Sequence, residues 1–209
     1  MSGSGDLPQP SLASTSPAAG VQRTDVTSSR IPVQASSTPE AAVNTPTSGA
    51  PPTTVSIPAI GVSSVIDPMG LNADGSLEVP ARGPSYDHAG WFTGSPPPGD
   101  SGPAVLLGHV NGRGGAPSVF SRLSELDVGD TVSVSRSDGS TTTFEIYRAE
   151  QYPKDAFPTT AVYGDTAGSE LRLITCAGAW DAEVHHYQDN TVVYARLLPP
   201  PLRPLMPAI

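Results

Sequence analysis

The chain has 209 residues, of which 37% are hydrophobic, and this is enough for one globular domain with an additional segment. It contains 24 Pro and 21 Gly, a load that favours strands and turns over long helices. The net charge of −9 and the lack of basic clusters argue against nucleic acid or an anionic lipid surface as a partner. A single cysteine excludes an intramolecular disulfide and a cysteine-based zinc site, and no stretch is apolar enough to span a bilayer or to serve as a signal peptide.

The two ends of the chain differ in composition from the middle. Residues 1–52 are dominated by Ser, Thr, Pro and Ala, with Val as the main larger hydrophobic residue. Such a segment buries too little apolar surface to offset the entropy of ordering, so it is predicted to be a disordered linker or stalk. The folded domain is then expected over residues 53–198, and residues 199–209 are predicted to be a Pro-rich, extended tail.

Short strand patterns with turns between them begin after this linker. Residues 53–62 predict a strand interrupted at Pro58, which indicates an edge strand or a bulge. Residues 72–76 (Asn-Ala-Asp-Gly-Ser) predict a hairpin turn, and a short strand is expected next at residues 77–79. The continuous apolar run at residues 104–107 predicts a strand buried on both faces.

The second half of the domain adds more strands and one helix. Residues 119–126 are the helical candidate, because their apolar side chains recur at helix-compatible spacing. Further strands are predicted at residues 131–134, 143–148, 171–175 and 191–197, with a hairpin turn at 137–140 and a long loop at 152–165. Many short strands at regular spacing indicate an all-β barrel or sandwich.

One cysteine and one histidine stand where strand patterns give way to turns. The strand-like run at residues 170–175 leads into Cys176, and a Gly-containing turn follows. The run at residues 104–107 likewise leads through Gly108 to His109. A thiol in such a place is expected to point outward rather than to pack. A cysteine and a histidine at strand ends form the minimal set for catalysis by a thiol nucleophile.

Both residues also have common structural roles. A lone cysteine is often a small buried hydrophobic residue, and a lone histidine after an apolar strand is often a capping or core imidazole. The thiolate needs a basic or cationic neighbour, which sequence spacing alone does not establish.

The segments that carry these two residues resemble the sortases, and specifically the class F sortases of high-GC Gram-positive bacteria. Residues 171–176 (Leu-Arg-Leu-Ile-Thr-Cys) resemble the Cys-bearing strand of that family, and residues 108–111 (Gly-His-Val-Asn) resemble its His-bearing turn. The likeness runs from about residue 53 to residue 198. Other segments that match in order are residues 57–62, 89–92, 98–103, 119–123, 152–158 and 189–195.

The resemblance implies an eight-stranded sortase β-barrel with one or two short helices. It also implies acyl transfer through a thioester, without a cofactor or metal. In that reaction Cys176 attacks the carbonyl of a sorting-signal peptide and expels an amine. His109 protonates this amine and then accepts a proton from the incoming nucleophile.

The chain departs from the family at the third catalytic group. Most sortases carry an arginine that stabilises the oxyanion at the start of the strand after the Cys strand, but the corresponding residues 186–191 contain no Arg. Gln188 or Asn190 could donate a neutral hydrogen bond there, without the charge of a guanidinium. Arg122 is the alternative cation, unless it is an ordinary surface residue. Arg172 lies four residues before the cysteine, roughly 13 Å along the strand, which is far for its side chain.

Several residues are candidates for the substrate groove. Lys154 lies in the loop where sortases take up the substrate, although it could equally be a surface lysine. Trp180 and Tyr187 are predicted on the loop after the cysteine, where they either contact the peptide or pack within the loop. His185 and His186 are adjacent on the same loop and are expected to be solvent-exposed imidazoles rather than metal ligands.

The expected function is that of a cysteine transpeptidase at the extracellular face of the cell membrane or in the cell wall. Its partners would be secreted proteins with a Leu-Pro-x-Thr-Gly-like sorting signal and a cell-wall precursor amine, and it would act as a monomer. Two alternatives remain: a cysteine peptidase that hydrolyses the same signal, and a non-catalytic β-barrel binding module. Membrane-anchored sortases have an N-terminal helix before an extracellular stalk, and residues 1–52 resemble such a stalk without the helix.

Overall fold

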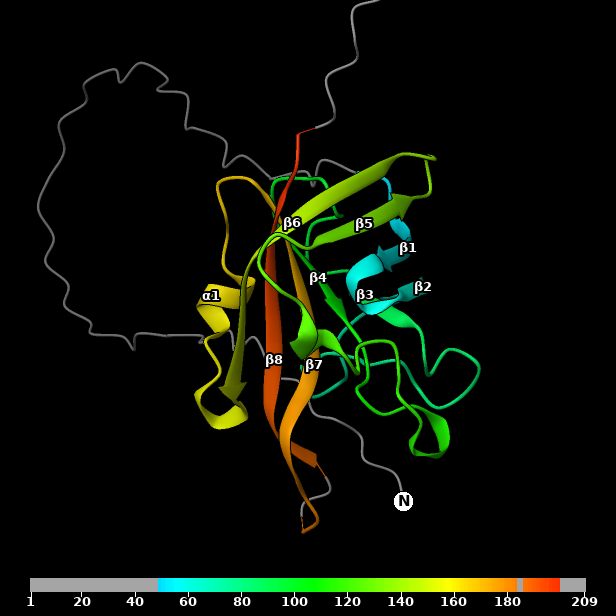
Figure 1. Cartoon of the computed structure of the whole chain (residues 1–209), viewed down its shortest axis with the longest axis vertical. Coiled ribbons are helices and arrows are strands. Elements are labelled where there is room, and N and C mark those ends of the chain that lie inside the picture. The colour runs from blue at the N-terminus through cyan, green and yellow to red at the C-terminus, as the bar shows by residue number, and fades with distance from the viewer. Residues whose placement is uncertain (1–48, 184–185, 200–209) are drawn as a thin grey trace, which may run out of the picture. The chain divides into compact units, whose positions relative to one another are not determined.

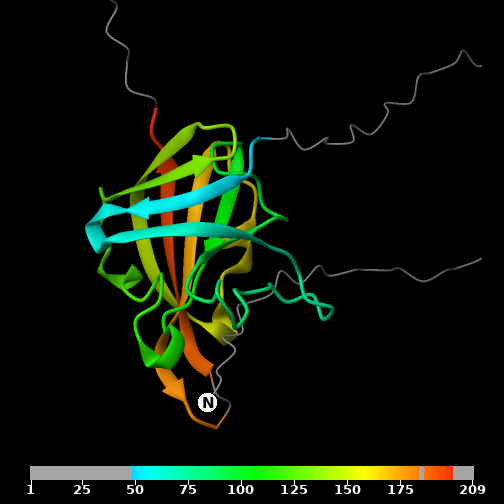
Figure 2. The same ribbon diagram turned by 90° about the vertical axis from the view of Figure 1, so that its right-hand side faces the viewer.

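A computed structural model of the chain describes residues 49–183 and 186–199. These residues form a closed barrel in which the strands follow one another in the order β1-β2-β3-β4-β7-β8-β6-β5 (Figures 1 and 2). The strands are β1 Pro52–Ile57, β2 Val62–Met69, β3 Ala89–Phe92, β4 Gly102–Leu107, β5 Thr131–Arg136, β6 Thr141–Pro153, β7 Ser169–Asp181 and β8 His186–Leu197. The helical elements are α1 Thr159–Tyr163 and the 3-10 turns η1 Pro58–Ile60, η2 Arg113–Gly115, η3 Leu123–Glu125 and η4 Lys154–Ala156. The prediction of an eight-stranded all-β barrel is confirmed.

The barrel contains two kinds of strand pairing. β2 pairs with β3 and β4 pairs with β7 in parallel, and the other neighbouring strands are antiparallel. Parallel neighbours end at the same end of a barrel. Whatever follows β4 in sequence therefore lies beside the residues that follow position 174 in β7.

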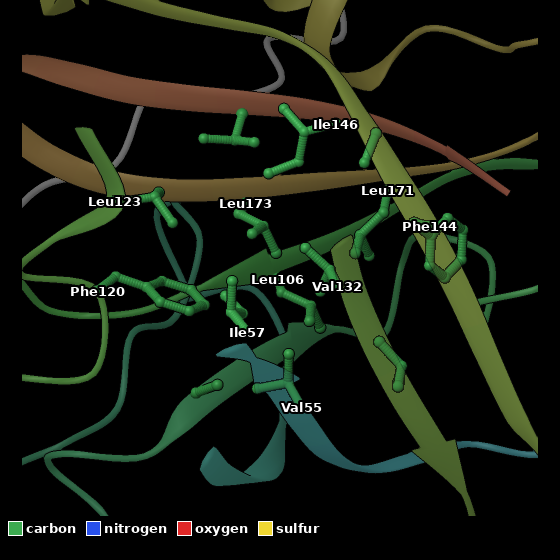
Figure 3. Packing of buried hydrophobic residues seen from close by; sticks show 14 of the residues in the cluster. Val55, Ile57, Leu106, Phe120, Leu123, Val132, Phe144, Ile146, Leu171 and Leu173 are labelled. Carbon is green, nitrogen blue, oxygen red and sulfur yellow. The ribbon is translucent and has the colours of Figure 1, made fainter. Parts of the chain in front are cut away.

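Two apolar clusters lie on the two sides of the strands. The interior is filled by inward-pointing side chains, of which Figure 3 labels Val55, Ile57, Leu106, Phe120, Leu123, Val132, Phe144, Ile146, Leu171 and Leu173. The second cluster lies on the outer face of β4, β7 and β8 and is covered by α1; its buried members are Leu77, Val105, Leu107, Val162, Ile174, Val192 and Tyr194. All six residues of β4 are buried, so the prediction of a strand buried on both faces is confirmed.

The helix predicted at residues 119–126 is wrong. Phe120, Leu123 and Leu126 are buried as their spacing indicated, but the backbone makes i→i+3 bonds: Leu123 N–H donates to Phe120 O and Leu126 N–H donates to Leu123 O. Only the 3-10 turn η3 results, because so short a segment gains little from helical hydrogen bonds and tertiary packing sets its shape. The α-helix lies instead at Thr159–Tyr163, inside the predicted long loop.

Other sequence boundaries also shift. Pro58 begins the 3-10 turn η1 between β1 and β2 and marks neither an edge nor a bulge, since a closed barrel gives β1 a partner on each side. Residues 77–79 form no strand, and Leu77 makes one isolated bridge with Leu71. β7 and β8 are longer than predicted and form a hairpin that extends well past Cys176.

The fold begins a few residues before position 53. Gly49 N–H donates to Asp100 Oδ2 at 3.1 Å, and Ser137 N–H donates to Pro51 O at 2.9 Å. Pro52 pairs with Arg136 of β5. The rest of the predicted linker and nearly all of the predicted tail lie outside the described residues. No helix within the described residues is long and apolar enough to cross a membrane.

We expect that deleting residues 1–48 changes the free energy of unfolding by less than about 1 kcal/mol, the scale of a typical single substitution. Their Ser/Thr/Pro-rich composition offers few large apolar side chains to bury. Deleting residues 1–57 serves as the contrast, because it also removes β1 and opens the barrel. Urea unfolding followed by circular dichroism measures both, and a large loss of stability in the shorter deletion would show that the segment packs on the barrel.

Candidate active site

The parallel pairing of β4 with β7 sets the position of the two candidate catalytic residues. The register aligns Leu107 with Ile174, and the chain then continues to His109 on one side and Cys176 on the other. Two hydrogen bonds extend this alignment by one residue. Gly108 N–H donates to Ile174 O at 3.1 Å, and Thr175 Oγ1 donates to Gly108 O at 2.8 Å. The histidine and the cysteine are thus neighbours across one strand pair.

A cavity of about 530 Å³ is lined by both Cys176 and His109. Its walls come from the turn after β4, from the segment between β2 and β3, and from the β7–β8 hairpin. The predicted nucleophile and the predicted base therefore face one space that is large enough for part of a peptide or for an amine.

Cys176 lies in the middle of a strand rather than at a strand end. β7 continues to Asp181, and Cys176 pairs with Asn190 of β8. The residue is only 8% exposed, so the expectation of an unpacked thiol is wrong, although Cys176 does project from the outer face of β7 with Ile174. Residues 177–179 indicated a strand end in the sequence. In the structure they form a register shift between Ala177 and Trp180, and Gly178 adopts the positive φ of 79° that this irregularity requires. The thiol nevertheless reaches the cavity.

The imidazole of His109 is held by two contacts from the segment between β2 and β3. Its Nε2–H donates to Pro80 O at 2.8 Å, and its ring stacks on Tyr86 with centroids 4.3 Å apart and an interplanar angle of 21°. A carbonyl can only accept, so Nε2 carries the proton and Nδ1 is the nitrogen available for proton transfer. Sequence reasoning missed both contacts, because no local pattern links positions 80 and 86 with position 109.

The β7–β8 hairpin forms the other wall of the cavity. Trp180 and Tyr187 are paired across it with ring centroids 5.2 Å apart at 71°, and Trp180 is 45% exposed. Asn111 Nδ2 donates to Tyr187 Oη and connects the hairpin to the turn after His109. The aromatic pair therefore lies on strands and not on a loop as predicted.

His88 and His186, the other histidines that the structure describes, belong to no metal site among the described residues. His186 belongs to β8 and its Nδ1–H donates to Tyr187 O at 2.9 Å, whereas His185 lies outside the described residues. His88 Nδ1 lies 2.9 Å from Asp67 Oδ2. In the part of the chain that the structure describes, no group of three or more His, Cys, Asp or Glu could hold a metal ion.

Two of the candidate oxyanion donors lie away from the cysteine–histidine cavity. Arg122 pairs with Glu125 at 2.6 Å, donates to Ile60 O at 3.3 Å, and lines a different cavity of about 440 Å³. Gln188 is exposed on β8 and does not line the cavity of Cys176.

Arg172 is close to the site in sequence but is already paired. Its Nη1 lies 2.7 Å from Glu170 Oε2, and its guanidinium stacks over the Tyr194 ring at 4.6 Å. Its charge is therefore compensated locally.

Asn190 does not line the cavity either, but it lies beside the nucleophile in the sheet. It is directly opposite Cys176 in the β7–β8 register, so both side chains project from the same face of the sheet. Asn190 is fully buried, and neither its Nδ2 nor its Oδ1 has a hydrogen-bond partner among the described residues. An unpaired buried amide costs about 1–3 kcal/mol, so a ligand group that paired with it would recover this free energy.

Lys154 is the second buried polar group without a partner in this region. It begins the 3-10 turn η4, directly after β6, and its Nζ is buried and makes no hydrogen bond within the described ranges.

Comparison with known proteins agrees with this architecture. The family model for the sortase domain matches residues 55–198. Sortase C-1 from Actinomyces oris has a TM-score of 0.53 and 22% identity, with 70% of this chain and 73% of that chain covered. Sortase A from Corynebacterium diphtheriae has a TM-score of 0.53 and 20% identity, with 77% of this chain and 66% of that chain covered. Sortase C1 from Streptococcus agalactiae, in complex with MTSET, has a TM-score of 0.55 and 20% identity, with 72% of this chain and 69% of that chain covered. Among curated proteins, none matches this chain in sequence.

The barrel, and a cavity that a lone cysteine shares with a histidine, are those of a thiol-dependent acyltransferase. The match over residues 55–198 covers well over half of the chain, and the chain belongs to the sortase family of cysteine transpeptidases.

The bond between Thr175 and Gly108 offers a test of how the site is aligned. We expect Thr175→Val to lower the free energy of unfolding by about 1–3 kcal/mol, because the Gly108 carbonyl loses its buried donor while the side-chain shape is kept. The rate of Cys176 alkylation should change as well, since this bond ties the His-bearing turn to the Cys-bearing strand. Thr166→Val removes a hydrogen bond of the same length, 2.8 Å, at the surface and should change neither quantity. Equal effects of the two substitutions would contradict the alignment role.

Proposed function

We propose that this protein is a class F sortase, a cysteine transpeptidase that cleaves a Leu-Pro-x-Thr-Gly-like C-terminal sorting signal and joins the new acyl end to a cell-wall amine. One observation carries the proposal: Cys176 and His109 line the same cavity and are aligned by the β4–β7 pairing. The class assignment is supported by residues 108–111 and 171–176, which resemble the two signature segments of class F.

The reaction follows from the positions of these two side chains. The Cys176 thiol passes its proton to His109 Nδ1, the thiolate attacks the scissile carbonyl carbon, and the carbonyl electron pair moves onto the oxygen. When the tetrahedral intermediate collapses, the C–N bond breaks and the leaving amine takes a proton from His109 Nδ1, since Nε2–H is engaged by Pro80 O. The incoming amine then attacks the thioester, returns its proton to Nδ1 and expels the thiolate.

We infer that Asn190 binds the oxygen on which the charge develops. Its buried amide is directly opposite the nucleophile and lacks a partner, whereas Arg122 is paired elsewhere. A prepositioned donor beside the reacting carbon stabilises the oxyanion without reorganisation during the reaction.

Hydrolysis of the same signal is the second candidate reaction. The amide of Asn190 is a neutral donor and stabilises an oxyanion less than a guanidinium does. A slow second step leaves the thioester open to water, so the ratio of transfer to hydrolysis is measured by adding an acceptor amine at increasing concentration. A non-catalytic binding module would form no thioester at all.

We place the reaction at the extracellular face of the cell membrane or in the cell wall, where sorting signals and cell-wall amines meet. The substrates are secreted proteins that carry the signal, and the enzyme acts as a monomer.

The first catalytic prediction concerns the nucleophile and the base. Incubation with a Leu-Pro-x-Thr-Gly-type peptide should give a covalent adduct on Cys176, visible by intact-protein mass spectrometry. Cys176→Ala should give none, and His109→Ala should lower the acylation rate by about two to four orders of magnitude, the usual contribution of general acid–base catalysis. His88→Ala is the matched control, because that imidazole is paired with Asp67 and does not line the cavity. Peptide cleavage by Cys176→Ala at the wild-type rate would show that the assignment is wrong.

The second catalytic prediction separates the oxyanion candidates. Asn190→Ala should lower the acylation rate constant by about two to three orders of magnitude, the cost of one oxyanion donor. Gln188→Ala and Arg122→Ala should leave that rate unchanged, because Gln188 is exposed and not opposite Cys176, and Arg122 is paired with Glu125 at another cavity. Single-turnover peptide cleavage measures all three.

A large loss in Arg122→Ala with full activity in Asn190→Ala would reverse the assignment. If all three variants keep full activity, the oxyanion is bound by backbone amides near Ala177 and Gly178. Gln188→Arg, which places a guanidinium near the usual family position, tests whether added charge increases the rate.

A further inference from the structure

The cavity that Cys176 and His109 share is cationic, although the protein as a whole is acidic. The chain has a net charge of −9, with 20 Asp and Glu against 11 Lys and Arg. Arg82 and Arg113 both line the cavity, and none of the described residues that line it is Asp or Glu. This local reversal of charge favours the binding of an anionic group from solution.

Arg82 is the cation of this cavity that has no partner. It is exposed and lies two residues after Pro80, whose carbonyl accepts from His109 Nε2 at 2.8 Å. Its guanidinium makes no hydrogen bond or ion pair among the described residues. A free guanidinium presents five N–H donors in a planar fork, and this geometry matches the two oxygens of a carboxylate.

Arg113 is held on the turn that follows the base. It begins the 3-10 turn η2, four residues after His109. Its Nε lies 3.6 Å from Asp87 Oδ2, which is longer than a hydrogen bond, and Asp87 also accepts from Ser118 Oγ at 2.9 Å. Asp87 does not line the cavity, so it orients the guanidinium but neutralises only part of its charge.

The carboxylates of the neighbouring hairpin do not neutralise these cations either. Asp189 is opposite Ala177 in the β7–β8 register and accepts from Gln151 Nε2 at 2.6 Å. Asp181, at the end of β7, accepts from the Glu183 N–H at 2.9 Å. None of these acidic residues lines the cavity. The positive charge of the cavity is therefore left for a ligand.

Both cations belong to the segments that hold the base. Arg82 lies on the segment between β2 and β3 that binds the imidazole, and Arg113 lies on the turn after His109. The β7–β8 hairpin forms the other wall with Trp180 and Tyr187, which are uncharged. The cavity is thus cationic on the side of the base and aromatic on the side of the hairpin.

The side of the base is where amines leave and enter. His109 Nδ1 protonates the leaving amine and deprotonates the incoming one, so both amines come to the same place. The leaving amine belongs to a residue inside a peptide chain, whose carboxyl group is part of the next peptide bond and carries no charge. The incoming amine has no such restriction. A carboxylate bound on this side therefore belongs to the acceptor.

We propose that Arg82 and Arg113 bind a carboxylate of the acceptor, so that the amine used by this protein is that of an amino acid with a free carboxylate close to it. The proposal rests on the function proposed above and names the class of its second substrate. The acceptor carries this charge before, during and after the reaction. The two guanidinium groups therefore act on binding of the acceptor and not on the transient charge of the tetrahedral intermediate.

The kinetic experiment compares acceptors that differ only in the carboxylate. γ-Aminobutyrate and ε-aminohexanoate are each compared with their primary amides, at equal concentrations of free amine. For at least one chain length, the wild type should reach half-maximal transfer at a roughly tenfold lower concentration of the carboxylate, the usual contribution of a charge-assisted hydrogen bond. Arg82→Gln and Arg113→Gln should each remove most of this preference, while the single-turnover acylation rate changes by less than about threefold.

Arg196→Gln is the matched control. The Arg196 side chain is 62% exposed, as is that of Arg113, but it pairs with Glu145 at 2.8 Å and does not line the cavity. This variant should keep the preference for the carboxylate. A melting temperature for each variant confirms that the barrel is intact.

Charge reversal and salt provide readouts that a structural role would not change. Arg82→Glu should reverse the preference, so that a four-carbon diamine becomes a better acceptor than γ-aminobutyrate. Sodium chloride should weaken the preference of the wild type for the carboxylate, because ions screen exposed charges, and it should leave transfer to the amide unchanged.

Alkylation of Cys176 tests the same charge without any sorting peptide. Iodoacetate and iodoacetamide react with a thiolate by the same displacement of iodide and differ in the carboxylate. The ratio of their rates, relative to that ratio for free N-acetylcysteine, should be roughly fivefold above one in the wild type. It should fall towards one in the double variant of Arg82→Gln and Arg113→Gln.

The outcomes separate this proposal from the function on which it rests. Equal use of carboxylate and amide acceptors by the wild type would overturn the proposal and leave the transpeptidase function intact. A loss of acylation by two orders of magnitude in Arg82→Gln, with the acceptor preference kept, would also overturn it, since the charge would then act on the signal peptide. If no sorting peptide forms a thioester, the proposed function and the acceptor assignment fail together, and the alkylation ratio alone shows whether the cavity attracts a carboxylate.

Discussion

The parallel pairing of β4 with β7 is the constraint on which the rest of the site depends. Their paired residues are 67 positions apart in sequence, yet their register brings the turn after Leu107 to the residues after Ile174. Gly108 continues this register beyond the end of β4, because its N–H donates to Ile174 O and its carbonyl accepts from Thr175 Oγ1. A slip of one residue would turn every side chain of β7 to the opposite face and remove the thiol from the cavity. The catalytic geometry is thus as well specified as the core.

The core specifies that register because β4 and β7 are packed on both faces. Inward residues such as Leu106 and Leu173 fill the barrel, while Leu107 and Ile174 pack outward under α1. Each fully buried aliphatic side chain contributes roughly 1.5–3 kcal/mol relative to an exposed one. Burial of both faces therefore stabilises the β4–β7 pairing well beyond any alternative pairing. This stabilisation offsets the cost of the unpaired polar groups near the end of β7.

The sequence predicts those parts of the fold that local patterns encode. The apolar run at 104–107 and the alternation at 131–134 both correspond to strands, because burial on one or two faces leaves a direct trace in composition. The resemblance to the sortases gave the barrel and the positions of His109 and Cys176. The spacing at 119–126 correctly marked buried residues, but burial does not distinguish a helix from a 3-10 turn in so short a segment.

The parts of the site that were missed depend on contacts between distant residues. Ala177 and Gly178 looked like a strand end, whereas the structure uses them for a register shift inside a long hairpin. The support of His109 by Pro80 and Tyr86 requires a segment about 25 residues upstream to fold over the ring. Sequence reasoning proposed Asn190 with two competitors, and only the β7–β8 register shows which of the three is opposite the thiol.

Unpaired polar groups beside the thiol connect the stability of this protein with its chemistry. A buried amide such as that of Asn190, which has no hydrogen-bond partner among the described residues, costs folding free energy because its hydration is lost on burial. The outer cluster under α1 offsets this cost and also excludes water, which strengthens the interaction once the carbonyl oxygen arrives. Packing of the β6–β7 segment, with Val162 and Phe157, therefore controls how well these buried groups are shielded from water. A chain that loosened this segment would recover hydration of Asn190 and would lose the low-dielectric surroundings in which electrostatic interactions are strong.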